Sequence, residues 1–150
     1  MKVLVVEAQQ GGADEAKAAL AAAGHTVVGC DTPEPHAPCR GLATVGTCPL
    51  DEHDIDVAVV HHTGRDLSVS ERGALCAARA RIPVVVDGDY RRSVSFGPGT
   101  FVAGVDLVDA CLSAASSGTA HAAAVRRDLL TSGVIDPDDV AGARPRVSFV

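Results

Sequence analysis

The sequence predicts a doubly wound α/β fold, in which helices cover both faces of a parallel sheet of five strands. Short valine-rich runs recur along the chain, and an Ala-rich or amphipathic stretch follows most of them after a short link. Aromatic residues make up only 3% of the 150 residues and hydrophobic residues 47%, so valine, leucine, isoleucine and alanine must fill the interior. A chain of this length fits one domain.

The first strand and helix lie at the start of the chain. Residues 3–6 form an apolar run typical of a strand that is buried on both faces of a parallel sheet. Residues 13–23 are Ala-rich, with two acidic residues in the first turn and a glycine directly after the end, which predicts a helix of about three turns. The second strand is expected over residues 25–29.

Three further strands and two helices follow the same alternation. The strands are expected over residues 55–60, 83–86 and 100–103. One helix is capped by Ser68 or Ser70 and ends near Arg81, and a second begins at the capping residue Asp106. The segment between the last two strands has little helical pattern.

The last part of the chain reads as an appendage to this domain. We expect the α/β domain over residues 1–116 and a C-terminal segment over 117–150, with a hinge at Ser116, Ser117 and Gly118. That segment contains one further expected helix, about 120–131, and residues 144–150 add an edge strand or remain an arm.

A long loop interrupts the alternation between the second and third strands. Residues 31–54 contain four prolines and two glycines and have no periodicity, so they fit neither a long helix nor a central strand. Such a loop is usually functional, disordered, or held by something other than its own apolar core. A bound metal would supply that constraint.

The loop carries four residues suited to bind a metal. Cys30, His36, Cys39 and Cys48 follow the pattern C-x5-H-x2-C-x8-C, and a Cys₃His set is typical of a closed structural zinc site. Three thiolates also suit an iron-sulfur cluster, which accepts histidine as a ligand. The alternative is a surface loop with incidental thiols. His53 is a reserve ligand in place of His36.

The chain has five cysteines and no signal-like segment, which points away from a disulfide framework. Cys76 and Cys111 lie in apolar helical patterns. Because free cysteine is often buried, we expect both to pack as small hydrophobic residues.

A second group of polar residues is expected at the carboxyl edge of the sheet. His61 and His62 follow the third strand, and Glu7, Asp87 and Asp89 are expected at the same edge. Imidazoles beside carboxylates suit acid-base chemistry or a second metal, so a metal-dependent hydrolase using His61, His62 and Asp87 is one alternative function. The other interpretation is a solvated loop end with hydrogen-bonded histidines.

Charge and hydropathy exclude several partners. The net charge is −6 and lysine and arginine form no stripe, which argues against nucleic-acid binding. The apolar run after Met1 is too short for a signal peptide or a membrane span, so we expect a cytoplasmic protein without membrane contact. A protein partner or a homodimer formed through the C-terminal helix remains open.

The order of strands and helices, opening with Lys2-Val3-Leu4-Val5-Val6-Glu7, resembles the receiver domain of bacterial response regulators, a flavodoxin-like fold, over about residues 1–116. Receivers carry acidic residues after the first strand, a phosphate-accepting Asp after the third, a Thr or Ser after the fourth and a Lys after the fifth. The corresponding positions here are listed by strand end: Glu7 and Ala8, His61, Asp87 or Gly88, and Gly104 or Val105.

Only Glu7 in that set is chemically suitable, so the resemblance implies a pseudo-receiver that has lost phosphoryl transfer. The leading expectation is therefore a regulatory or interaction domain without enzymatic activity, whose loop is stapled by zinc. The alternatives are an iron-sulfur redox or iron sensor and the metal-dependent hydrolase described above.

Overall fold

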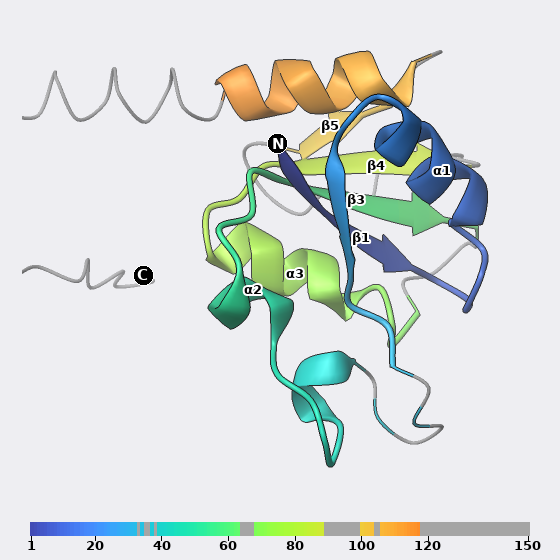
Figure 1. Ribbon diagram of the computed structural model, residues 1–150, viewed down its shortest axis with the longest axis vertical. Coiled ribbons are helices and arrows are strands. Elements are labelled where there is room, and N and C mark those ends of the chain that lie inside the picture. Colours follow the sequence, from blue (N-terminus) through green and yellow to red (C-terminus); the bar gives the residue numbers. More distant parts are fainter. Residues whose placement is uncertain are drawn as a thin grey trace, which may run out of the picture. The chain divides into compact units, whose positions relative to one another are not determined.

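The computed structural model confirms the α/β class, with an all-parallel sheet between helices (Figure 1). The structure describes residues 1–32, 34, 37, 39–63, 68–88, 100–103 and 106–117, with the backbone alone at 101 and 102. His36, Asp89 and the helix and strand expected in the C-terminal segment lie outside these ranges. The chain divides into two compact units, Met1–Gly118 and Thr119–Val150, and all described residues belong to the first.

The sheet has the strand order β2-β1-β3-β4-β5, and all its strand pairs are parallel. Four strands of four to six residues form most of it, and the three-residue β5 continues it beside β4. The strands are β1 Lys2–Glu7, β2 Thr26–Gly29, β3 Val57–His62, β4 Val84–Gly88 and β5 Thr100–Val102. The helices are α1 Asp14–Ala22, α2 Pro49–Glu52, α3 Arg72–Arg79, the 3₁₀ turn η1 Arg40–Leu42, and a helix over residues 107–117.

The predicted ends of two strands are wrong. β3 was expected over 55–60 and β4 over 83–86, but both extend two residues further towards their carboxyl ends. His61 and His62 therefore end β3 instead of following it. Backbone pairing of His61 with Asp87 and of His62 with Gly88 continues the ladder through these polar residues. The ladder depends on backbone groups, so apolar character marks its buried centre better than its ends.

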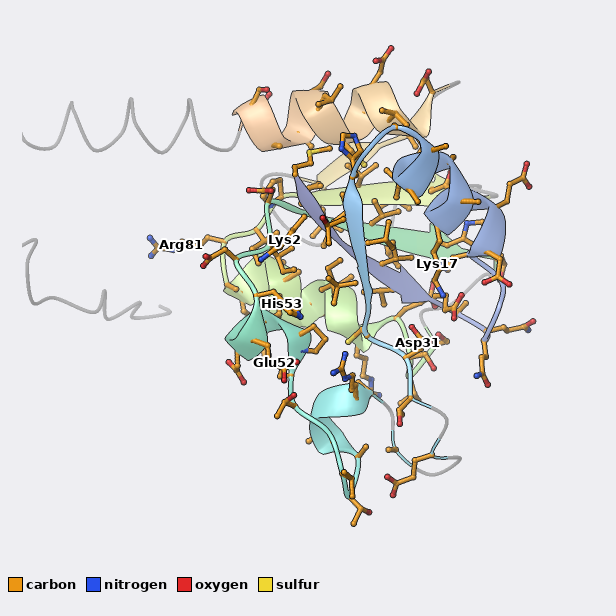
Figure 2. All side chains as sticks on the ribbon, in the orientation of Figure 1. Lys2, Lys17, Asp31, Glu52, His53 and Arg81 are labelled. Atoms are coloured by element: carbon orange, nitrogen blue, oxygen red, sulfur yellow. The ribbon has the colours of Figure 1, made fainter. Side chains whose placement is uncertain are left out.

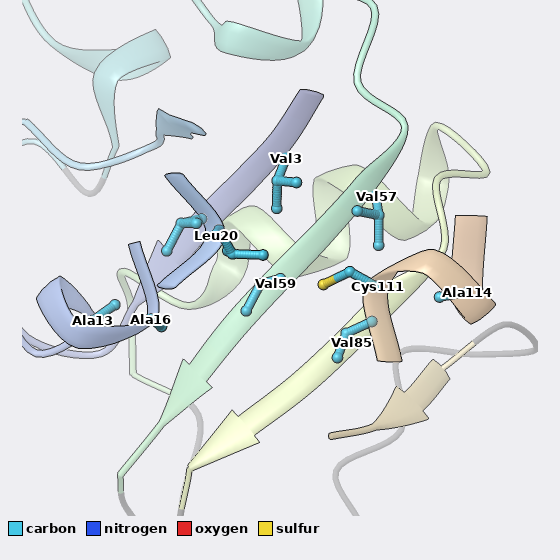
Figure 3. Close-up of a cluster of buried hydrophobic side chains, with 10 residues drawn as sticks. Val3, Ala13, Ala16, Leu20, Val57, Val59, Val85, Cys111 and Ala114 are labelled. Atoms are coloured by element: carbon cyan, nitrogen blue, oxygen red, sulfur yellow. The ribbon is translucent and has the colours of Figure 1, made fainter. Parts of the chain in front are cut away.

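Each face of the sheet carries its own apolar cluster, because successive side chains of a strand point to opposite faces. One cluster joins alternate valines of β1, β3 and β4 to α1 and to the helix over 107–117 (Figure 3). Its members include Val3, Val59, Leu20, Cys111 and Ala114, all fully buried.

The opposite cluster joins the other alternate residues of the same strands to α3. Leu4 and Val60 pack there with Ala74 and Ala77 of α3, and Cys30 completes the buried set at the end of β2. Helices thus cover both faces.

The expected helix signals act as predicted in two places. Gly24, after α1, has a φ of +81°, a conformation that glycine adopts without strain. The Asp106 carboxylate accepts hydrogen bonds from the backbone N–H groups of Val108 and Asp109, at 2.8 and 3.1 Å. The hinge expected at Ser116 and Ser117 is wrong for these two residues, which belong to the helix.

The loop between β2 and β3 has only η1 and α2 as regular structure in its described part. Polar contacts join its segments. Both the backbone N–H and the hydroxyl of Thr44 donate to the Glu34 carboxylate at 2.8 Å. Leu42 and Val45 are 71% and 93% exposed, so these two large apolar residues contribute nothing to the interior.

Candidate functional site

Three titratable residues lie in one row at the carboxyl edge of the sheet. Glu7 of β1 is in register with His61 of β3, and His61 is in register with Asp87 of β4. Register partners on parallel strands share a face, so these side chains belong to the face that α1 covers. The expectation that Glu7, His61 and Asp87 meet at one edge is therefore confirmed by the backbone pairing.

Glu7 is closed off by the first turn of α1. Its side chain is buried, and its two carboxylate oxygens accept hydrogen bonds from the backbone N–H groups of Gly11, at 3.1 Å, and Ala13, at 3.0 Å. The Lys17 ammonium donates a third bond at 3.1 Å. Burial raises the pKa of the Glu7 carboxyl, but the bonds from Ala13, Gly11 and Lys17 outweigh it and lower the pKa below its usual value.

Lys17 links this carboxylate to two others. Its ammonium nitrogen lies 3.9 Å from a carboxylate oxygen of Asp31 and 3.9 Å from one of Asp14. Figure 2 shows Lys17, from α1, on the side of the molecule where Asp31 follows the end of β2. One ammonium group thus lies within 3.9 Å of three carboxylates at this edge and offsets only part of their negative charge.

His61 pairs with Asp87 on the same face. The imidazole Nδ1 lies 2.9 Å from a carboxylate oxygen of Asp87, and about a quarter or less of each side chain is exposed. A carboxylate on one ring nitrogen orients the ring and selects its tautomer.

His62 points to the opposite face, where it pairs with Glu71. Its Nδ1 lies 2.5 Å from a carboxylate oxygen of Glu71, and both side chains are almost fully buried. The second Glu71 oxygen accepts a bond from the Ser68 backbone N–H at 2.6 Å, while the Ser68 hydroxyl accepts one from the Glu71 N–H at 3.2 Å. This reciprocal pattern is a capping box before α3.

The sheet therefore separates the two imidazoles that the hydrolase alternative required at one centre. Neighbouring residues on a strand face opposite ways, and His61 and His62 have different carboxylate partners. Sequence reasoning missed Glu71, although the spacing of Ser68 and Glu71 is the signature of a capping box.

A small open pocket lies at the same edge, beside the ends of β1 and β2. Glu7, Cys30, Asp31 and Ser70 are among the residues that line it. The crevice outside the carboxyl ends of parallel strands is where ligands bind in open α/β sheets. The strand order reverses between β1 and β3, and the pocket lies on the other side of β1, because no residue of β3 lines it.

Cys30 lies at the boundary between the pocket and the apolar cluster of α3. It is 7% exposed, and its sulfur would lie 3.1 Å from a Cβ atom added to Gly73. Burial, and then charge repulsion from the thiols of Cys39, Cys48 and Cys76 and from the Asp31 carboxylate, raise the pKa of the Cys30 thiol to about 12. Three of the predicted ligands, Cys30, Cys39 and Cys48, therefore lie close enough to interact electrostatically, and Cys76 of α3 lies close to Cys30 as well.

Backbone contacts hold Cys39 and Cys48 in this neighbourhood. The N–H of Arg40, next to Cys39, donates to the Cys30 carbonyl at 2.9 Å, and Cys39 packs against the apolar cluster of α3. Cys48 precedes α2, and its Cβ would lie 3.0 Å from a Cβ atom added to Gly41 in η1. Both thiols are partly exposed.

The prediction for the two remaining cysteines is half correct. Cys111 is buried, as expected, and its pKa is raised to about 11 by burial and then by the Asp87 carboxylate. Cys76 is exposed, so its expected packing as a small hydrophobic residue is wrong. The buried residues of α3 are Gly73, Ala74 and Ala77, which places Cys76 at the margin of the helix face that packs.

Within the described ranges, no group of three or more His, Cys, Asp or Glu side chains is arranged to hold a metal ion. That search does not reach His36. All five thiols are free. The metal set Cys30, His36, Cys39 and Cys48 stays a prediction, and the three described members lie near one another around η1 and the end of β2.

No protein-family model matches the chain, and no curated protein matches it. None of the helices in the part of the chain that the structure describes is long and apolar enough to cross a bilayer.

Proposed function

We propose that this chain is a regulatory or interaction domain of the pseudo-receiver type, without enzymatic activity, whose loop between β2 and β3 is stapled by a metal ion. The strand order 2-1-3-4-5 supports the flavodoxin-like part of the proposal, because receivers and flavodoxins share it. A likeness of topology alone says nothing about chemistry.

The main support for a loss of phosphoryl transfer is that both carboxylate oxygens of Glu7 are occupied by hydrogen bonds. A magnesium ion at this edge would need free carboxylate oxygens, but both oxygens of Glu7 already accept bonds from α1. In the row where a receiver has its phosphate-accepting carboxylate, this chain has His61, and the nearby Asp87 is paired with that imidazole. At this edge of the sheet, Glu7 is paired with Lys17 and Asp87 with His61.

The arrangement of the loop supports the metal. Cys39 packs against the apolar cluster of α3, together with Leu50 from the same loop, while Leu42 and Val45 face solvent. Leu50 and the buried Pro49 thus anchor the α2 end of the loop, and the stretch around η1 has no large buried apolar side chain of this kind. Zinc is the proposed metal because thiolate and imidazole are its usual structural ligands. The partner of such a domain is a protein or a second copy of the chain.

The convergence of thiols equally favours the second candidate, an iron-sulfur redox sensor. Colour separates the two, because Zn²⁺ is d¹⁰ and has no visible absorption. A brown, oxygen-sensitive protein would replace the zinc assignment with the sensor.

Two measurements test the proposal. Elemental analysis of the anaerobically purified full chain is expected to give about one zinc per chain, and Cys39→Ser is expected to lower the content by about half or more. Incubation with Mg²⁺ and a small phosphodonor such as acetyl phosphate is expected to add no phosphoryl group by intact-mass spectrometry. Incorporation of phosphate at this edge would contradict the loss of phosphoryl transfer. Unchanged zinc content in Cys39→Ser would contradict the metal site in the loop.

A further inference from the structure

We propose that Cys76 of α3 is the fourth ligand of the metal, so that Cys30, Cys39, Cys48 and Cys76 form a four-thiolate zinc site that fastens the loop onto α3. The inference rests on the metal-binding part of the proposed function and replaces His36 in the ligand set. It changes the role of the metal from closing the loop on itself to joining two separate elements.

The proposed site is centred on Cys30, which contacts α3 at Gly73. The Cys30 sulfur faces Gly73, where an added Cβ would lie 3.1 Å from it. Cys76 lies three residues further along α3, and residues at this spacing are neighbours on the helix surface. The thiol of Cys76 is therefore one helical turn from the backbone that Cys30 contacts.

Contacts within the loop hold Cys39 and Cys48 near the end of β2. The hydrogen bond from the Arg40 N–H to the Cys30 carbonyl fixes Cys39 beside the end of β2. The close approach of Gly41 to Cys48 places the second thiol against η1, directly after Cys39. Residues 39–41 thus lie between Cys48 and the end of β2, where Cys30 contacts α3.

The two faces of the sheet separate the fifth cysteine from this group. Cys30 is buried in the apolar cluster of α3 and Cys39 packs against that cluster, whereas Cys111 is buried in the cluster on the opposite face. A divalent cation would offset the repulsion between thiolates held close together.

Exposure determines which thiols can adjust to a metal. Cys30 is buried, while Cys76 is exposed and Cys39 and Cys48 are partly exposed. As placed in the described structure, the four thiols do not form a group arranged to hold a metal ion, so the proposed site requires these three side chains to rotate towards Cys30. Binding of Zn²⁺ replaces four S–H protons with four Zn–S bonds and releases the protons to solvent, without oxidation or reduction.

The experiment compares matched variants of the full chain: Cys76→Ser, His36→Ala and Cys111→Ser. Each is reduced, freed of metal with a chelator and titrated anaerobically with Zn²⁺ against a chromophoric competitor, and with Co²⁺ to read the thiolate-to-metal charge-transfer band. Far-UV circular dichroism checks that each variant is folded. Cys111→Ser is the control for loss of a thiol outside the cluster.

We expect Cys76→Ser to bind zinc at least about tenfold more weakly and to lose about a quarter of the charge-transfer intensity, because one of four thiolates is gone. His36→Ala and Cys111→Ser should bind as the wild type does. Cys76→His should recover the affinity but not the lost intensity, because imidazole is also a zinc ligand.

Other outcomes of the same titrations distinguish failure of this inference from failure of the proposed function. Wild-type affinity in Cys76→Ser together with loss of metal in His36→Ala would overturn the role of Cys76 and leave the Cys₃His loop site standing. A wild-type chain that takes up neither Zn²⁺ nor Co²⁺ would overturn the metal in both. Iron and sulfide in the purified protein would overturn the zinc assignment.

Discussion

Lys17 and Glu7 form an ion pair between the first turns of α1 and the end of β1, with the ammonium nitrogen 3.1 Å from a carboxylate oxygen. The carboxylate is buried, and the lysine is about a quarter exposed. Because the backbone N–H groups of Gly11 and Ala13 donate to the same carboxylate, Glu7 fixes how α1 leaves the sheet.

Replacing Glu7 with glutamine is expected to lower the free energy of unfolding by about 2 kcal/mol, since charge-assisted hydrogen bonds to buried donors are weakened. Urea denaturation at pH 7 measures the change. Asp14→Asn is the matched control, because Asp14 also faces Lys17 but is mostly exposed, and it should change stability by less than about 0.5 kcal/mol. Equal effects of the two substitutions would contradict a special role for Glu7.

The same carboxylate predicts a dependence of stability on pH. Its pKa in the folded protein lies below the ordinary value of 4.5, so its contribution is fully present above pH 4.5 and is lost as the pH falls through the folded value. The stability difference between wild type and Glu7→Gln should therefore shrink as the pH falls below 4.5. A difference that stays constant down to the acid transition would show that the charge of Glu7 is not what stabilises the fold.

The centre of each strand was predictable from sequence, and the ends were not. Runs such as Val84-Val85-Val86 are buried on both faces, and few other structures accommodate such runs. At the strand ends, His61 and His62 keep their backbone pairing although their side chains resemble those of a loop. Local composition cannot show that a polar residue finds a carboxylate on a neighbouring strand or helix.

The residues of the candidate metal site were also predictable only in part. The thiols of the loop were predictable, because cysteines among prolines have no apolar pattern to explain them. Cys76 was not, because it stands beside Leu75 in what reads as an apolar helix face. The face of α3 that packs is instead made of glycine and alanine, since Val6 and Cys30 leave no room for larger side chains.

Gly73 is expected to be the position on α3 least tolerant of a methyl group. An added Cβ would lie 3.1 Å from both the Cys30 sulfur and a Val6 methyl carbon, and both neighbours are buried. Gly73→Ala should destabilise the metal-free protein by about 1 to 3 kcal/mol, although alanine favours a helix elsewhere. Adding Cys30→Ala should recover part of that cost in a double-mutant cycle. A more stable Gly73→Ala protein would show that the contact relaxes easily.

The buried pair of His62 and Glu71 is expected to be worth more than the capping box that it joins. Glu71→Ala leaves the His62 ring without its carboxylate and should cost about 3 kcal/mol, whereas Ser68→Ala removes only the cap and should cost about 1 kcal/mol. Thermal or urea unfolding of the two variants measures both values. Equal costs would mean that Glu71 acts only as a capping residue.

Cys111 and Cys76 should differ sharply in reactivity towards a thiol reagent. Cys111 is fully buried, and its pKa is raised to about 11 by burial and by the Asp87 carboxylate, so at pH 8 its reactive thiolate is scarce and shielded. Cys76 is exposed on α3. Brief alkylation of the reduced, chelator-treated protein with iodoacetamide, read by peptide mass spectrometry, should label Cys76 well before Cys111. Repeating the labelling in urea should remove the difference, because unfolding exposes both thiols equally. Early labelling of Cys111 in the native protein would mean that the helix over residues 107–117 opens readily from the sheet.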